Sequence, residues 1–375
     1  MAENSKIEWT THTFNPWRGC TKVSAGCANC YAETMSGRNP GTLGVWGPSG
    51  TRVVASEAMW KQPLKWNNLA ANAYESARLE ARAESSNPCD PDPFEFEAPE
   101  RPRVFCASLA DVFEDWAGDM HLSNGDIAGR EVAGGGSMKV TIQDVRNRLF
   151  ALIDATPHLD WLLLTKRPEN IAKMMPEWKT TSEISSSLTG PNRKLVVTAT
   201  GGVRPNLWLG TSVENQQTAD ERIPHLLRVP AKVRFLSMEP LLGPVDLGEV
   251  PIGMAGPLRP GAAADAGPRI DWVIVGGESG HGARPMHPEW VRSIRDQCQT
   301  AGVAFFFKQW GDFAPRDAGG FFSVSDKTTH TIDELGRLDV KQGGGQLVQV
   351  GRIGKKNAGR LLDGREWSEF PEAIA

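Results

Sequence analysis

Short apolar runs of strand length alternate along this chain with segments of helical spacing. Helical periodicity appears in residues 141–156, 215–229 and 287–302. The strand-length runs are apolar on both faces, which is typical of parallel strands covered on both sides. Repeated β-then-α units predict a parallel sheet, and six or more of them favour a closed or partly closed barrel over an open doubly wound sheet. The runs span residues 103–111, 160–168, 206–215, 233–240, 271–280 and 303–311.

The predicted organisation is one α/β barrel domain over residues 1–313 and a C-terminal extension over residues 314–375 that packs on the barrel. A chain of 375 residues with 40% hydrophobic content has enough apolar side chains for a sizeable core. Four stretches between the predicted elements are expected to be loop insertions. They lie near residues 74–100, 117–140, 176–204 and 244–270.

Composition narrows the expected location and partners. The first ten residues contain no apolar signal region, and no run approaches the roughly 20 apolar residues of a membrane span. We therefore expect a cytoplasmic protein with no membrane partner. The net charge of −4 argues against a wholly basic protein that coats nucleic acid, but it leaves room for a local basic groove.

All six apolar runs end in polar residues. In a parallel barrel the C-terminal ends of the strands open onto one face, where active sites are assembled. Any one of these residues alone is more simply explained as a helix cap or a solvated turn. Six strands that all end this way predict an enzyme pocket ringed by carboxylates, hydroxyls and cations. The residues are Ser108, Asp111, Thr165, Lys166, Arg167, Thr211, Ser212, Glu214, Ser237, Glu239, Glu278, Ser279, Lys308 and Gln309.

Three cysteines lie close together in the stretch NPWRGCTKVSAGCANCYAE, at Cys20, Cys27 and Cys30. In a reducing compartment, clustered cysteines more often bind metal or react than form disulfides. A first strand within residues 7–17 is predicted before them and a helix after them, so the loop falls on the face of the polar strand ends. Three thiolates can hold an iron–sulfur cluster in which one iron keeps an open coordination position for a small molecule.

The order of strand, three-cysteine loop, helix and repeated β/α units resembles the radical S-adenosylmethionine (SAM) superfamily. More closely, the chain is similar to a phage-associated three-Cys-motif family. The segments that carry this resemblance are IEWTTHTFNPWRGCTKVSAGCANCYAE, LLLTKRPENI, LWLGTSVENQ, RFLSMEPLLGPV, WVIVGGESGHGARP, FFFKQWG and GKKNAGRLLDGREWSEFP. The resemblance implies a partial or complete (β/α) TIM-like barrel of radical SAM type with loop insertions. It also implies that Cys20, Cys27 and Cys30 hold a [4Fe–4S] cluster and that SAM chelates the remaining iron.

The superfamily's general layout implies further contacts with SAM. Its amino group is often bound at the end of the second strand, which here offers Ser108 and Asp111. The ribose hydroxyls usually meet a polar side chain near the fourth strand, where TSVEN supplies Ser212 and Glu214.

The cysteine spacing differs from the commonest radical SAM signature. It is C-x6-C-x2-C in this chain and C-x3-C-x2-C in that signature. Asn29 stands where that signature has an aromatic residue. Tyr31 or Trp17 is therefore the expected neighbour of the SAM adenine.

Other charged residues at the strand ends have two possible interpretations each. Lys166 and Arg167 can bind the SAM carboxylate or a substrate phosphate, since arginine suits bidentate recognition of either anion, or they can simply begin the next helix. Glu278, in the sequence GGESG, is either the cap of a tight turn or a ligand contact. Together with Glu239, these side chains are expected to face the same cavity as the cysteines.

The resemblance implies a radical SAM enzyme. In that mechanism a reduced cluster passes one electron to SAM, the S–C5′ bond breaks, and the 5′-deoxyadenosyl radical abstracts hydrogen from a substrate. The phage association suggests a nucleotide or a base in DNA or another nucleic acid as the substrate. An electron donor such as a flavodoxin or ferredoxin is the implied partner.

Two alternatives remain open. In the first, the cysteines and a histidine such as His12 form a structural zinc site, and the barrel is a hydrolase or a binding protein. C-x2-C is common in zinc sites. In the second, an iron–sulfur site has a structural or sensing role in a protein that binds nucleic acid or a partner protein without radical chemistry. The remaining cysteines, Cys89, Cys106 and Cys298, are interpreted as ordinary packing or surface thiols.

Overall fold

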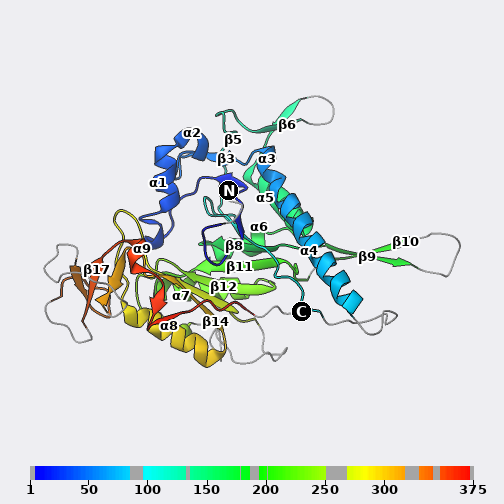
Figure 1. Cartoon of the computed structure of the whole chain (residues 1–375). Helices are drawn as coiled ribbons and strands as arrows, with labels where there is room; N and C mark the ends of the chain where they lie inside the picture. The colour runs from blue at the N-terminus through cyan, green and yellow to red at the C-terminus, as the bar shows by residue number, and fades with distance from the viewer. Residues whose placement is uncertain are drawn as a thin grey trace.

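The computed structural model describes residues 5–84, 96–131, 136–177, 179–185, 194–200, 202–250, 268–316, 329–340 and 347–371. Its centre is a seven-stranded sheet in which each strand pairs in parallel with the next one along the chain. The sheet curls into a half-barrel (Figure 1). In sheet order its strands are β1 (His12–Thr13), β4 (Arg103–Cys106), β8 (Asp160–Thr165), β11 (Leu207–Ser212), β12 (Val233–Met238), β13 (Trp272–Gly276) and β14 (Ala304–Gln309).

Each of the six apolar runs contains one strand of this sheet, and the architecture is a partial β/α barrel. The first strand is shorter than the predicted span 7–17. Pro16 has no N–H to donate, so the ladder cannot continue through it, and Trp17–Arg18 leaves the central sheet as β2. This strand pairs with β3 (Arg52–Val54), which pairs with β5 (Met120–His121).

The longer helices begin and end as their sequences predict. Thr141 and Asp144 form a capping box at the start of α5, and Asn215 and Thr218 form one at the start of α7. Gly302 takes the left-handed conformation after α8, with φ 63°. The helices are α1 (Tyr31–Arg38), α2 (Pro40–Leu43), α3 (Glu57–Trp60), α4 (Gln62–Glu84), α5 (Ile142–Asp154), α6 (Ile171–Met174), α7 (Gln216–Leu227), α8 (Pro288–Ala301) and α9 (Lys355–Ala358), with single 3-10 turns at Ala25–Cys27, Pro168–Asn170 and Leu247–Glu249.

Small sheets lie outside the half-barrel. The predicted insertion 117–140 contains β5 and the hairpin of β6 (Gly129–Glu131) and β7 (Ser137–Lys139). The insertion 176–204 contains the hairpin of β9 (Lys179–Ser185) and β10 (Lys194–Thr200), which projects to the right in Figure 1. The insertion 74–100 begins as part of α4. Its residues 85–95, and residues 251–267 of the insertion 244–270, lie outside the described residues.

Two aromatic side chains close the base of the half-barrel. Trp9 packs 4.8 Å from Phe105 and meets Trp272 edge-on at 6.0 Å, as measured between ring centroids. Phe370, from the other end of the chain, lies 5.1 Å from Trp272 and carries the Arg103 guanidinium over its ring at 4.0 Å. The base is therefore packed rather than hollow, which leaves the opposite end of the strands for a binding site.

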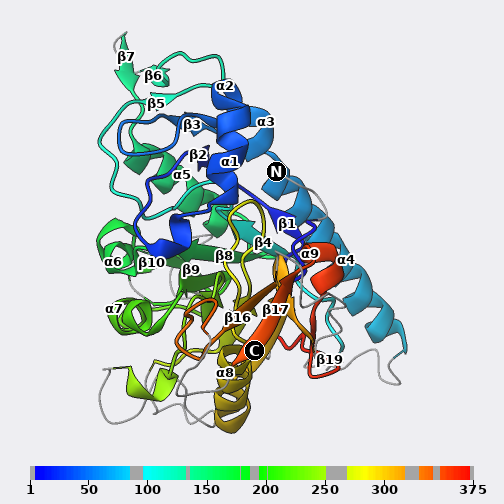
Figure 2. The same ribbon diagram turned by 90° about the vertical axis from the view of Figure 1, so that its left-hand side faces the viewer.

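The C-terminal extension contacts the last strand where it is described. Phe307 N donates to Trp367 O at 2.9 Å, and Phe305 N donates to the Glu369 carboxylate at 3.0 Å. These contacts cover the edge of β14, which would otherwise present unpaired backbone groups. The extension also contains β16 and β17, which form a sheet with β15 that lies low in Figure 2, and a short hairpin. Their bounds are β15 (Phe313–Pro315), β16 (Thr329–Ile332), β17 (Val348–Arg352), β18 (Leu361–Leu362) and β19 (Arg365–Glu366).

Helices that could cross a membrane are absent from the described residues, since none is both long enough and apolar enough.

Candidate functional site

A cavity of about 440 Å³ lies at the C-terminal ends of the central strands. All three clustered cysteines line it, and so do eight of the nine side chains proposed for SAM. Its apolar wall includes Phe105 and Trp9, and Trp9 also closes the base of the half-barrel. The eight side chains are Tyr31, Ser108, Asp111, Lys166, Arg167, Ser212, Glu239 and Glu278.

The cysteine loop begins at Cys20 and ends at Cys30, directly before α1. Gly19 precedes it with φ 111°, a backbone conformation that suits glycine, and Gly19 N donates to Leu109 O at 3.0 Å. All three thiols are free and half-buried. Among the described residues, no three His, Cys, Asp or Glu side chains stand close enough together to hold a metal ion as they are placed here.

Asp111 organises the end of β8. Its Oδ1 accepts hydrogen bonds from the Thr165 hydroxyl (2.7 Å) and Phe113 N (3.0 Å). Its Oδ2 accepts from Lys166 N (3.0 Å) and Arg167 Nη1 (2.9 Å). Four donors fill the acceptor capacity of a carboxylate. Asp111 therefore positions the two cations after β8, and its predicted contact with the SAM amino group would require one of these bonds to open.

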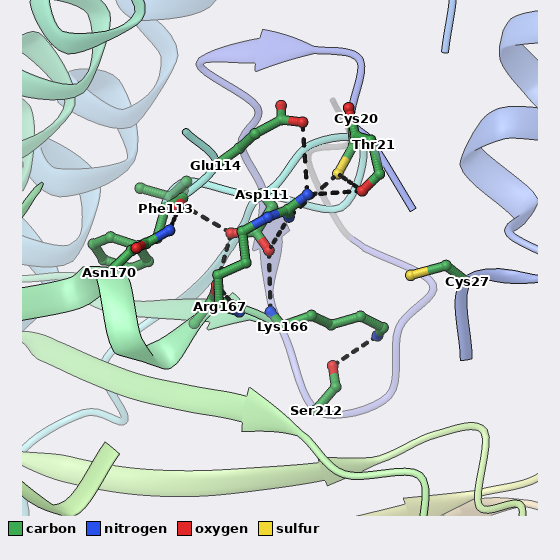
Figure 3. Close-up of polar contacts among 12 residues, drawn as sticks. Cys20, Thr21, Cys27, Asp111, Phe113, Glu114, Lys166, Arg167, Asn170 and Ser212 are labelled. Carbon is green, nitrogen blue, oxygen red and sulfur yellow. Dashed lines mark hydrogen bonds and ion pairs between the residues drawn. The ribbon is translucent and has the colours of Figure 1, made fainter. Parts of the chain in front are cut away.

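Arg167 points at the start of the cysteine loop (Figure 3). Its Nη1 lies 3.7 Å from Cys20 Sγ, and its Nη2 donates to Thr21 O at 2.7 Å. Burial alone would lower the pKa of Arg167, but the charge of Asp111, together with that of Glu114, raises it above its ordinary value. The guanidinium is thus a permanent cation beside a candidate ligand.

The thiol of Cys20 is held in its neutral form. Burial raises the pKa of Cys20 to about 12, and the charges of Asp111 and Glu114 act in the same direction, against the opposing effect of Arg167. A metal binds the thiolate rather than the thiol. Loading a metal at Cys20 would therefore release a proton.

Behind Arg167 lies a fully buried ion pair that the sequence did not reveal. Arg52 donates from Nε and Nη2 to the two carboxylate oxygens of Glu114, at 2.7 Å each, and the side chains are 0% and 2% exposed. Arg52 also donates to the Thr21 hydroxyl at 2.8 Å. Arg146 donates to the main-chain oxygen of Glu114 at 2.9 Å. This network fixes Thr21 and, through it, the neighbouring Cys20.

Glu214 holds the middle of the cysteine loop instead of lining the cavity. Its carboxylate is 1% exposed and accepts hydrogen bonds from Ser24 Oγ and Arg222 Nη1, both at 2.9 Å. Lys166 Nζ lies 3.6 Å from it and donates to Ser212 Oγ at 2.9 Å. The proposed contact of Glu214 with the SAM ribose stays a prediction, since the structure gives this side chain a buried anchoring position.

Glu278 holds the last part of the loop. It accepts hydrogen bonds from Asn29 Nδ2 (3.1 Å) and from Arg284 Nε and Nη2 (2.8 and 2.7 Å). Burial would raise the pKa of Glu278, but these hydrogen bonds hold it below its ordinary value. Arg284 also donates to Ala25 O at 3.0 Å. The tight-turn acid of the sequence is thus tied to the cysteine loop.

The cavity wall beyond the loop carries a second ion pair. Lys308 Nζ donates to both oxygens of Glu239, at 2.9 and 2.7 Å, and Gln309 Nε2 donates to Glu239 at 3.0 Å. Gly276 lets the Glu239 side chain lie close against the backbone of β13, because a Cβ at this position would lie 3.2 Å from the Glu239 carboxyl carbon. The Glu239–Lys308 pair is neutral overall and presents its polar atoms to the cavity.

The two aromatic candidates for the adenine are placed differently. Tyr31 lines the cavity and donates from Oη to Ser108 O at 2.7 Å. Trp17 is 0% exposed within the core. His12, the histidine considered for a zinc site, stacks on Trp66 at 4.1 Å and is not among the described residues that line the cavity.

Several residues that shape the site carried no sequence signal of their own. Arg52 and Glu114 lie outside every motif, and only their burial reveals them. Ser24 and Asn29 lie inside the cysteine loop, where their polar side chains between the cysteines were the available signal. Arg284 follows GGESG by a few residues and is its hydrogen-bond partner.

Gly26→Ala tests how tightly the loop lies against the barrel. An added Cβ would lie 2.6 Å from Cγ of Glu214, whose buried carboxylate is held in place by Arg222 and Ser24. We expect a loss of about 1–3 kcal/mol in the free energy of unfolding, measured by urea denaturation. The matched control is Gly37→Ala in α1, where an added Cβ meets nothing within 4 Å and alanine stabilises by up to ~1 kcal/mol. Equal stabilities of the two variants would contradict the close packing.

Comparison with known proteins identifies the family. Among curated proteins and among solved structures, no significant match is found. One family model, described as a protein of unknown function (DUF5131), matches residues 4–124 and 137–371. The match includes the cysteine loop, all the strands of the half-barrel and α9. The chain is therefore a member of the DUF5131 family.

Proposed function

We propose that this protein is a radical SAM enzyme in which Cys20, Cys27 and Cys30 hold a [4Fe–4S] cluster, and that it modifies a nucleotide or nucleic-acid base in a phage context. The observation that carries the proposal is the common cavity. Three free thiols from one loop line it together with polar side chains from the ends of the parallel strands. Fold alone implies no function, so the argument rests on this site.

The donor set fits an iron–sulfur cluster in its chemistry. Thiolates are the usual ligands of such clusters, and three of them leave one iron for a further ligand. His12 is stacked on Trp66 away from the cavity, which disfavours the four-ligand zinc alternative. Because the sulfurs are not yet grouped as a metal site, the loop would have to draw them together on loading.

The residues around the cysteines have distinct tasks in this proposal. Bound cluster and SAM supply one-electron cleavage of the S–C5′ bond. Arg167 orients Cys20 and places a positive charge beside its sulfur. Lys166, 20% exposed and hydrogen-bonded to Ser212, offers an ammonium group to the SAM carboxylate. The apolar wall of Trp9 and Phe105 excludes water from a reactive radical.

SAM cleavage is the test that distinguishes this function from a structural or sensing cluster. Adding SAM to the dithionite-reduced protein should change its electron paramagnetic resonance spectrum, because one iron gains new ligands. Chromatography should then detect 5′-deoxyadenosine and methionine. A cluster that persists while the spectrum is unchanged and no 5′-deoxyadenosine forms would contradict radical chemistry and favour the sensing alternative.

A further inference from the structure

One cation of the cavity differs from the others in having no acidic partner within the described part of the chain. Among the described residues five cations line the cavity, and four of them pair with carboxylates. The fifth, Lys355 of α9, is exposed, and its ammonium group makes no ion pair or hydrogen bond with any residue in the described part of the chain. The four pairs are Lys22–Glu33 (2.6 Å), Lys166–Glu214 (3.6 Å), Arg167–Asp111 (2.9 Å) and Lys308–Glu239 (2.7 Å).

The backbone around Lys355 is anchored to the end of β14. Gly354 N donates to Asp312 O at 3.0 Å, and Trp310 N donates to Gly359 O at 3.2 Å. Both ends of α9 are therefore tied to the residues that directly follow the strand. This anchoring places Lys355 at the rim of the cavity on the same side as Gln309.

Gln309, which lines the cavity, has an acceptor atom without a partner in the described ranges. Its side chain is 4% exposed, and Nε2 is used by Glu239, but Oε1 has no hydrogen-bond partner among the described residues. Trp9, which lines the cavity and is 2% exposed, likewise has an indole Nε1 without a partner there. A buried polar atom left unpaired is destabilising, so a ligand that offers both a donor and an acceptor would be favoured.

We propose that this side of the cavity is a nucleotide subsite, in which Lys355 contacts the phosphate and a planar base lies inward toward Trp9 and Gln309. A nucleobase carries N–H donors and carbonyl or ring-nitrogen acceptors, so it offers a donor for Gln309 Oε1 and an acceptor for Trp9 Nε1. A phosphate is a strong partner for a lysine at the rim, and a base that enters a pocket leaves its backbone phosphate outside. The inference rests on the proposed function, since it names the substrate class of the same site.

Binding of nucleosides and nucleotides to the full-length protein, without SAM or reductant, tests the subsite. Equilibrium dialysis should give thymidine 5′-monophosphate or another deoxynucleotide at least tenfold higher affinity than its nucleoside. Lys355→Ala should abolish that difference, whereas Lys356→Ala, which removes an adjacent exposed lysine that does not line the cavity, should retain it. Gln309→Met should weaken nucleoside and nucleotide by the same factor.

Competition with a second ligand distinguishes the two sources of the phosphate, a DNA strand and a free nucleotide. A short single-stranded oligodeoxynucleotide that competes with the mononucleotide, with an affinity that falls as salt rises, would identify a DNA strand; failure to compete would identify a free nucleotide. An unchanged nucleotide-to-nucleoside ratio in Lys355→Ala would overturn the subsite. Nucleotide binding by a protein that never forms a cluster would support the subsite and overturn only the radical SAM proposal.

Discussion

Replacing Cys20, Cys27 or Cys30 by alanine is expected to abolish the iron and sulfide of the anaerobically purified protein. The wild-type chain should be brown and contain about four irons and four sulfides, as a cubane cluster requires. Each variant should lose nearly all of both, because two thiolates cannot hold the cluster against solvent. Iron and acid-labile sulfide assays measure the outcome directly.

The control is Cys298→Ala, which makes the same chemical change in α8, where the thiol is 0% exposed in the hydrophobic core. It should retain the full iron content. Cys89→Ala, at a position outside the described residues, is expected to do the same. A colourless wild-type protein that carries one zinc would contradict the cluster and restore the zinc alternative.

Glu114→Ala is expected to destabilise the fold by about 3–5 kcal/mol, because it leaves Arg52 as an uncompensated buried charge. The Arg52 side chain is 0% exposed, and Glu114 is its only carboxylate partner among the described residues. Urea denaturation gives the free energy of unfolding. The same variant should retain less iron, since Arg52 also holds the Thr21 hydroxyl next to Cys20.

An exposed ion pair provides the matched comparison. Glu57 meets Arg148 with two hydrogen bonds of 2.6 Å, but its side chain is 71% exposed. Solvent screens such a pair, so Glu57→Ala should cost no more than ~1 kcal/mol. If Glu114→Ala cost as little, the buried network would not be what fixes the start of the cysteine loop.

The fold anchors the cysteine loop at several points. Its sequence alone placed three thiols near the ends of parallel strands, and the fold supplies the anchors that keep them there. Arg167, Glu214 and Glu278 come from three different strand ends and each contacts a different part of the loop. We infer that the main role of the polar side chains at the strand ends is to anchor the cysteine loop, and that contact with a bound ligand is their secondary role.

The sequence by itself determined the sheet and the face that carries the site. Apolar runs such as those at Trp161 and Trp272 can only be buried between two covered faces, and β/α alternation puts successive strands in parallel. Their C-terminal ends must then share one edge, so Lys166, Ser212 and Glu239 meet around the cavity although they are distant along the chain. These results follow from local periodicity, which a single sequence contains.

Only the tertiary structure decided what each polar side chain does at that edge. The sequence does not distinguish a carboxylate that faces a ligand from one that pairs with a buried arginine. Its role depends on which residue from a distant part of the chain lies beside it in the fold. Glu214 is hydrogen-bonded to Arg222 and Ser24, whereas Lys355 has no partner among the residues that the structure describes. Such pairings depend on distances between separate elements of the fold, because charges interact strongly only over a few ångströms in a shielded site, and a linear pattern does not contain those distances.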